Sequence, residues 1–267
     1  MRRLGVVGLV SLDRVDGGLP RLGGAPVYAA RALRLLGHPA VVATKLADED
    51  RPRLAALGVP VVARSAGRTI GFRIENDGDR RSLEIDELGE PWTEEEARGW
   101  LGAALAGCDW VHAGALTRAD FPAATLAALA RGRKVSLDGQ ALVRRPEVGP
   151  LRLDADYDPE VLRRVDLLKL ARDELDALGC ELDEGSLASL GVREVVVTLG
   201  REGAVVFADG LAEHVPTFPL EGVDPTGAGD AWTTAYIEYR RRRHSPVSAA
   251  RLANGAVSAL LGRWPVR

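Results

Sequence analysis

Residues 221–239 read EGVDPTGAGDAWTTAYIEY and place two glycines and an aspartate where an apolar, helix-like pattern begins. We expect the backbone N–H groups of Gly227, Ala228 and Gly229 to lie at a helix N-terminus, without partners inside the helix. Such N–H groups, with the positive end of the helix dipole, make a binding site for an anion. Glycine also lets the main chain approach the anion closely. The stretch therefore predicts an anion site at the mouth of a helix.

Asp230 follows this glycine turn directly. A carboxylate is electrostatically unfavourable beside an anion unless it takes a proton from an attacking hydroxyl. Anion donors next to a base are what phosphoryl transfer to an alcohol needs, which predicts Asp230 as the catalytic base. The alternative is that Asp230 only caps the helix, because acidic residues are common in a first turn.

Short apolar runs alternate with longer segments of helical period along most of the chain. This alternation predicts an α/β fold, with a doubly wound, mostly parallel central sheet flanked by helices. The predicted strands lie near residues 4–10, 40–44, 109–113, 134–138, 165–170 and 194–200, and the predicted helices near 25–37, 48–58, 92–107, 120–132, 172–179 and 230–243. Gly37 and Gly58 should end two of these helices, and Thr93 with Glu96 fits a capping box.

Two regions break the alternation and predict antiparallel hairpins. Residues 60–86 alternate apolar and polar side chains around NDGD, and residues 203–218 should turn at Asp209 and Gly210. We interpret the first hairpin as a small β lid, because open α/β sheets bind ligands at strand ends and need cover there. A plain extension of the sheet edge is the alternative. The length suits a single domain, residues 1–267, that carries this lid.

The composition excludes several classes of protein. A formal net charge of -3 disfavours a nucleic-acid partner, which requires a broad basic surface. Cys108 and Cys180 are the two cysteines and suggest neither a disulfide framework nor a zinc site. No segment approaches the roughly 18 continuous apolar residues of a membrane span, so we expect no membrane partner and a cytoplasmic protein.

DPTGAGD, residues 224–230, closely resembles the signature of the ribokinase (PfkB) family of sugar and nucleoside kinases. RLGGAPVYAARALRLLGH, residues 21–38, is similar to the first signature of that family. The resemblance extends over nearly the whole chain. It implies a ribokinase-like fold with a β lid, ATP and Mg²⁺ as cofactors, a small sugar or polyol as substrate, and a homodimer that pairs through the lid.

The resemblance also implies residues for the substrate. Gly23 and Gly24 would let the main chain meet a polyhydroxyl substrate, and Asp13 would accept hydrogen bonds from its hydroxyls. A plain turn and a solvated strand end are the alternatives. The element VSLDGQALVRRP, residues 135–146, resembles a D-x-Q-G element of some members. The remaining substrate residues implied are Asp138, Gln140 and Lys45, with Arg144 near the phosphates.

VVVTLGREGAVVF, residues 195–207, resembles the strand and turn of the family's nucleotide site. The ATP-binding residues implied are Thr198, Gly200, Gly203 and Asn254, the last as a polar contact to the purine, although small residues around it could instead serve helix packing. The family motif N-x-x-E is altered here. Glu174 would organise Mg²⁺ through water, whereas Ala171 replaces the asparagine, which should weaken metal binding. A monovalent cation such as K⁺ would bind near Asp224 and Thr226.

The acceptor is predicted from departures within the family. The continuation GKGANQ of ribokinases is absent, and GGAPVYAA together with Lys45 looks most like the branch of myo-inositol and related polyol kinases. A nucleoside kinase is the alternative, but it needs an aromatic stacking partner and the candidates are few, such as Tyr28, Phe72 and Trp92. A second alternative is a sugar-binding regulator that has lost the chemistry, which Ala171 suggests.

Overall fold

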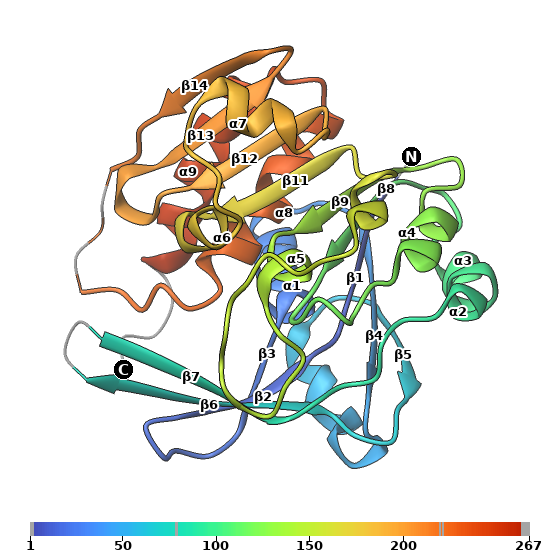
Figure 1. Cartoon of the computed structure of the whole chain (residues 1–267). Coiled ribbons are helices and arrows are strands. Elements are labelled where there is room, and N and C mark those ends of the chain that lie inside the picture. The colour runs from blue at the N-terminus through green and yellow to red at the C-terminus, as the bar shows by residue number, and fades with distance from the viewer. Residues whose placement is uncertain (1–2, 78–79, 219, 221, 263–267) are drawn as a thin grey trace.

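The computed structural model describes residues 3–77, 80–218, 220 and 222–262, and a large twisted sheet forms its centre (Figure 1). The nine strands lie in the order β14-β13-β12-β11-β9-β8-β1-β4-β5. Their bounds are β1 Arg3–Gly8, β4 Ala40–Leu46, β5 Val61–Ser65, β8 Cys108–Gly114, β9 Lys134–Asp138, β11 Leu167–Ala171, β12 Glu194–Thr198, β13 Ala204–Ala208 and β14 Leu211–Val215. In this spatial order, the seven strands from β12 across to β5 are parallel to one another. β13 is antiparallel to β12, and β14 is antiparallel to β13. The predicted fold class is confirmed.

Helices cover both faces of this sheet because neighbouring residues of each strand point to opposite faces. Val6 packs in the core under α1, α8 and α9, whereas Val7 packs in the core on the other face. The first layer consists of α1 Ala25–Leu36, α8 Ala228–Arg241 and α9 Pro246–Leu261. The other helices are α2 Glu94–Arg98, α3 Trp100–Ala104, α4 Ala123–Leu129, α5 Gln140–Val143, α6 Arg172–Ala177 and α7 Glu184–Ser189, with 3₁₀ turns η1 Asp48–Leu57, η2 Pro159–Leu162 and η3 Gly200–Glu202. Two buried layers thus fix the strand ends that carry the site.

Local signals place several element ends as predicted. Gly37 ends α1 in the left-handed conformation with φ 65°, and Gly58 ends η1 with φ 63°. The capping box of Thr93 and Glu96 is present at the start of α2. The single helix predicted for residues 92–107 is divided in two at Gly99, whose ψ of -116° is not helical.

The lid differs from its prediction. β5, which falls inside residues 60–86, pairs in parallel with β4 and belongs to the central sheet. The hairpin consists of β6 Ile70–Asp77 and β7 Arg80–Glu87, and it lies inside a second sheet of order β10-β7-β6-β2-β3. The other strands are β2 Ser11–Val15, β3 Arg21–Gly23 and β10 Gly149–Pro150. The lid therefore draws on three separate parts of the chain, because distant segments complete the hydrogen-bonding edges of the hairpin. Figure 1 shows two of these parts, β2–β3 and β6–β7.

The outward face of the lid is charged. Arg73 pairs with Glu84 at 3.0 Å and with Asp86 at 2.7 Å. A dimer that formed through this face would have to match these charges with opposite charges on the second copy. The homodimer stays a prediction. Across the described residues, no helix combines the length and apolarity needed to cross a membrane.

Candidate active site

The glycine turn forms the N-terminus of α8, as predicted. Gly227 is the N-cap residue, with a left-handed φ of 77°. The residues before Gly227 are held by hydrogen bonds to Asp224. The amide and the hydroxyl of Thr226 both donate to Asp224 Oδ1, at 3.0 and 2.6 Å. The amide of Ala228 donates to Pro225 O at 2.9 Å. Ala228 is therefore not one of the free anion donors that the sequence predicted, because the tight turn uses its N–H internally.

Three amides of the turn remain available to an anion. Among the described residues, the N–H groups of Gly227, Gly229 and Asp230 have no backbone partner. A side chain at Gly227 would collide with the ring of Tyr28, because an added Cβ would lie 2.0 Å from Tyr28 Cδ1. Tyr28 on α1 thus packs directly on the turn. Glycine is required at 227 both by its φ and by this close approach.

The turn stands between two cavities. One cavity, of about 390 Å³, is lined by Gly227, Gly229 and Asp230, and the other, of about 320 Å³, is lined by Ala228 and Gly229. We call them the acceptor cavity and the donor cavity, after the roles that the family resemblance implies. Gly229 belongs to both linings. An anion held by the turn would therefore contact molecules in either cavity.

Asp230 is half-buried at the acceptor cavity. Burial raises the pKa of its carboxyl from the usual 3.8 to about 7, and the negative charge of Asp138 adds to this effect. The charges of Lys169, His112 and Arg144 offset part of the rise. A carboxyl with a pKa near 7 is well matched to accept a proton at neutral pH.

Lys169 is a site residue that the sequence analysis missed. It lies on β11, is 4% exposed, lines the acceptor cavity, and its Nζ is 3.2 Å from the position that a Cβ on Gly229 would take. Burial alone would lower the pKa of its ammonium, but the carboxylates of Glu174, Asp138 and Asp230 together raise it. Lys169 is therefore charged and lies behind the anion turn. A single lysine inside the apolar run VDLLKL was the available signal.

The acceptor cavity brings together several predicted substrate residues. Its lining includes Asp13, Gly24, Gln140 and Arg144 as predicted, and also Ser11, Tyr28, Phe72, Ile74, Arg81, Leu83, Leu116, Leu151, Lys169, Asp173 and Thr226. Asp13 is 5% exposed, and its Oδ1 accepts a hydrogen bond of 2.7 Å from Ser11 Oγ. Gly23 lies outside the lining, but a Cβ there would come within 1.9 Å of Asp13 Oδ2. Gly23 therefore makes room for the carboxylate.

The sequence analysis predicted Asp138 as a substrate residue, but Asp138 does not reach the acceptor cavity. It is fully buried and absent from the lining, because its position at the end of β9 turns the side chain into the core. Its Oδ2 lies 3.4 Å from His112 Nε2, also fully buried. Asp138 acts on the site through its negative charge, which raises the pKa of the Asp230 carboxyl.

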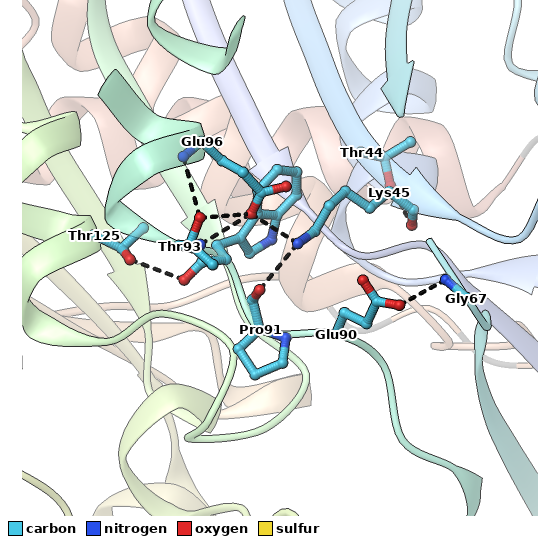
Figure 2. Close-up of polar contacts among 9 residues, drawn as sticks. Thr44, Lys45, Gly67, Glu90, Pro91, Thr93, Glu96 and Thr125 are labelled. Carbon is cyan, nitrogen blue, oxygen red and sulfur yellow. Dashed lines mark hydrogen bonds and ion pairs between the residues drawn. The ribbon is translucent and has the colours of Figure 1, made fainter. Parts of the chain in front are cut away.

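Lys45 is also not a substrate residue in this structure (Figure 2). Its Nζ donates to Pro91 O and to Glu96 Oε2, both at 2.9 Å, and it lies 4.8 Å from the centre of the Trp92 ring. Figure 2 shows the two hydrogen bonds of Lys45, to Pro91 and to Glu96. The predicted substrate contact is wrong, because the ammonium group is already bound by Pro91 and by Glu96 of α2, which are distant in sequence.

The donor cavity contains all four residues predicted for ATP, Thr198, Gly200, Gly203 and Asn254. Apolar side chains such as Val257 and Leu261 line it as well. The amide of Asn254 is committed within the protein, since Oδ1 accepts from Trp232 Nε1 at 2.7 Å and Nδ2 donates to Pro216 O at 3.0 Å. These bonds argue against the predicted purine contact and give Asn254 a role in holding the Trp232 side chain.

The described residues contain no group of three or more His, Cys, Asp or Glu side chains that could hold a metal ion by themselves. Glu174 is 3% exposed, and its Oε2 accepts the Ala171 amide at 2.8 Å. It packs against Gly139, outside the cavity linings. Glu174 therefore offers no direct ligand in either cavity, and water and the donor phosphates would have to supply the ligands of Mg²⁺.

The site predicted for K⁺ fits a cation poorly. Asp224 Oδ1 is occupied by Thr226, and Asp224 Oδ2 lies 3.9 Å from the guanidinium of Arg21. A positive charge already faces the carboxylate.

Comparison with known proteins supports the kinase interpretation. An inositol 3-kinase of Zea mays is 33% identical over 126 residues, covering 46% of this chain and 32% of that protein. Fructokinase-1 of Zea mays is 29% identical over 255 residues, covering 86% of this chain and 76% of that protein. The chain thus spans about a third of the inositol 3-kinase that it matches.

A solved structure agrees over the whole chain. It is a pyrophosphate-dependent kinase in the ribokinase family, complexed with a pyrophosphate analog and myo-inositol, with 27% identity and a TM-score of 0.80 over 99% of this chain and 97% of that chain. Residues 11–263 match the pfkB family carbohydrate kinase description. With its glycine turn, its lid and this match over nearly its full length, the chain belongs to the pfkB family of carbohydrate kinases.

Proposed function

We propose that this protein is an ATP-dependent kinase that phosphorylates a hydroxyl of a small polyol, with myo-inositol as the first acceptor to test. One observation carries the proposal. The free amides at the start of α8 lie where a partly apolar donor cavity meets a polar acceptor cavity, and Asp230 lies on the acceptor side.

The chemistry follows from these positions. Asp230 accepts the proton of the acceptor hydroxyl while that oxygen forms a bond to the γ-phosphorus and the bond to ADP breaks. The amides of Gly227, Gly229 and Asp230, with the ammonium of Lys169, stabilise the charge on the transferring group. Mg²⁺ would enter with the donor phosphates and would neutralise part of their charge, and Glu174, which lies outside both cavity linings, would act on it only through intervening water.

The polar lining supports a polyhydroxyl acceptor. Asp13 accepts hydrogen bonds through a buried carboxylate, and Gln140 and Arg144 add groups that pair with hydroxyls. The sequence similarity to inositol 3-kinases and the structural similarity to a kinase bound to myo-inositol both favour a cyclic polyol.

Pyrophosphate is a second candidate for the phosphoryl donor. It is favoured by the structural similarity to a pyrophosphate-dependent kinase and by Asn254, whose amide is committed to Trp232 and Pro216. The donor cavity has apolar walls beyond the turn, which suit a nucleoside and are not needed by pyrophosphate. This lining is why we place ATP first.

The test measures phosphate transfer from ATP and from pyrophosphate, each with Mg²⁺, to a panel of polyols, pentoses, hexoses and nucleosides. We expect myo-inositol or a related polyol to give the highest kcat/KM, with ATP as donor. Asp230→Asn should lower kcat by about 10²–10⁴-fold while leaving donor affinity unchanged. Asp183→Asn, at an exposed helix cap, is the matched control.

Four results would contradict parts of the proposal. Turnover of Asp230→Asn near that of the wild type would refute the assigned base. Higher kcat/KM with pyrophosphate would replace ATP as donor, and a nucleoside preference would replace the polyol. Binding of a polyol without transfer from either donor would identify a regulator.

A further inference from the structure

A third cavity lies next to the acceptor cavity and takes no part in the proposed reaction. Its volume is about 560 Å³, larger than that of either cavity at the glycine turn. It shares Tyr28 and Thr226 with the acceptor cavity, but neither Gly227 nor Asp230 belongs to its lining. A volume of this size is typical of a site for a small molecule. The proposed function therefore leaves a well-formed cavity without a ligand.

Three arginines from three segments of the chain line this cavity, which we call the arginine cavity. Arg21 belongs to β3, Arg31 to α1 and Arg53 to η1. The lining contains one carboxylate, that of Asp224, so its positive charges outnumber its negative charge. Guanidinium groups stay protonated at every physiological pH, and such a cluster raises the local concentration of anions. The charges of the lining thus favour an anionic ligand.

Contacts within the protein hold two of these guanidinium groups at the cavity and leave part of each exposed. Arg53 donates to Pro20 O at 3.2 Å and lies 3.2 Å from Asp50 Oδ1, while Arg21 lies 3.9 Å from Asp224 Oδ2. The side chains of Arg21 and Arg53 are 42% and 46% exposed. A guanidinium group has five N–H donors, and these contacts use only some of them. The remaining donors can pair with the oxygens of a phosphate group.

Most of the remaining lining is hydrocarbon. Leu22, Val27 and Leu57 contribute aliphatic side chains, and Tyr28 contributes its ring. Val27 and Leu57 are 1% and 5% exposed, so they form a fixed apolar base beneath the charged groups. Inorganic phosphate would contact only the arginines. A phosphate monoester with an apolar body would also bury hydrocarbon against this base, which adds to its affinity.

Tyr28 connects the arginine cavity with the glycine turn. The guanidinium carbon of Arg31 lies 5.3 Å from the centre of the Tyr28 ring, and the same ring lies against Gly227, where an added Cβ would come within 2.0 Å of Cδ1. Thr226, which also lines both cavities, directly precedes Gly227. A ligand in the arginine cavity would therefore contact two residues that support the turn. Its negative charge would also repel the phosphates of a donor bound at the turn.

We propose that the arginine cavity is a regulatory site for a phosphate monoester with an apolar body, and that its occupation weakens donor binding at the glycine turn. The coupling is reciprocal, so a bound donor also weakens the binding of the ester. The inference goes beyond the proposed function, because the site lies outside both cavities of the reaction. Its binding step needs no turnover and can be measured whatever the acceptor is.

The experiment measures the binding of phenyl phosphate and of inorganic phosphate by titration calorimetry. The test variant is Arg53→Gln, and its matched control is Arg51→Gln. Both arginines belong to η1, are 46% exposed, pair with the aspartate three residues earlier and donate to a backbone carbonyl at 3.2 Å, but Arg51 does not line the cavity. We expect the affinity for phenyl phosphate to fall about 10- to 100-fold in Arg53→Gln and to be unchanged in Arg51→Gln.

A second pair of variants on α1 repeats the comparison. Arg31→Gln should also weaken the binding of phenyl phosphate, whereas Arg34→Gln removes an exposed charge outside the cavity and should not. In the wild type, inorganic phosphate should bind more weakly than phenyl phosphate, because it leaves the apolar base uncovered. Equal affinities in Arg53→Gln and Arg51→Gln would overturn the assigned site. Inorganic phosphate that binds as tightly as phenyl phosphate would overturn the assignment of an ester.

The coupling is tested by measuring the Kd of the donor, ATP or pyrophosphate, at increasing concentrations of phenyl phosphate. In the wild type, the apparent Kd should rise roughly 5-fold or more and then level off, because a separate site has a finite effect. Arg53→Gln should need more phenyl phosphate for the same rise. A Kd that stays constant, or one that rises without limit as in direct competition at the turn, would overturn the coupling. These results do not depend on phosphate transfer, so a failure of the proposed reaction is recognised separately.

Discussion

At the scale of single residues, opposing charges around Asp230 set the state of the proposed base. Asp138 lies buried beneath it and raises the pKa of its carboxyl, whereas Lys169 lowers that pKa. Both residues are themselves buried, where charges interact more strongly than in water. Removing either charge should therefore change the protonation of Asp230 in a predictable direction.

The rate should fall in acid as Asp230 becomes protonated. With its pKa raised to about 7, the carboxyl is a base only above that pH, so kcat/KM should decline as the pH falls through about 7. Asp138→Asn removes a negative charge, lowers the pKa of Asp230 and should move this decline to lower pH. The measurement is the pH profile of kcat/KM. A profile that stays in place in this variant would show that Asp138 does not act on the base.

Lys169→Met should shift the same profile in the opposite direction. Loss of the ammonium raises the pKa of Asp230 and removes a stabilising charge from behind the anion turn. We expect kcat to drop by about 10²–10³-fold and the acid decline to move to higher pH. Lys169→Arg keeps the charge and should retain more of the turnover. Equal losses in both variants would point to packing and not to charge.

At the scale of elements, contacts between helices and strand ends hold the site together. α1 places Tyr28 against the glycine turn that begins α8, so that the first signature of the sequence supports the second. Lys45 near the end of β4 plays a similar part on the other face, where it binds Glu96 (Figure 2) and lies over the ring of Trp92. Its contribution should therefore appear in stability and not in substrate affinity.

Lys45→Met tests this role. Removing a largely buried ammonium leaves Pro91 O without its donor and Glu96 without its counter-ion, although Glu96 keeps its hydrogen bonds from Thr93; the loss should cost about 1–3 kcal/mol of the free energy of unfolding. Lys134→Met is the matched control, because Lys134 is exposed and also lies over a ring, that of Trp110. Chemical denaturation measures the stability, and kcat/KM for the acceptor should be unchanged. A raised KM at unaltered stability would restore Lys45 as a substrate residue.

At the scale of the whole molecule, the parallel strands bring both cavities to the glycine turn. Thr198 at the end of β12 lines the donor cavity, and Lys169 near the end of β11 lines the acceptor cavity. The carboxyl ends of parallel strands are the usual ligand-binding edge of such a sheet. Each cavity has its own lining apart from Gly229, so donor and acceptor should stabilise the fold separately.

Thermal unfolding can separate the two ligands. A ligand at 100 times its dissociation constant adds about 2.7 kcal/mol to the stability of the protein that binds it. Asp13→Ala should abolish the rise in Tm caused by the acceptor and preserve the rise caused by the donor. Ser258→Trp, which fills the donor cavity, should do the reverse. Loss of both responses in one variant would indicate a single shared site or a damaged fold.

The amino-acid sequence by itself determined the elements and the position of the anion turn. The helix ends at Gly37 and Gly58, the capping box at Thr93, and the strand alternation all depend on residues close together in the chain, whose preferences are local. The family resemblance came from the same kind of contiguous pattern, DPTGAGD, and it was confirmed.

Only the tertiary structure decided which side chains reach the cavities. Lys45 is bound by Glu96 of α2, and Asp138 is buried in the core. Asn254 is hydrogen-bonded to Trp232, whereas Lys169 lies beside the glycine turn. Each outcome depends on a partner many residues away in sequence, and residue type and local spacing do not encode that partner. The lid shows the same limit, since β2 and β10 complete a sheet that a hairpin pattern alone could not reveal.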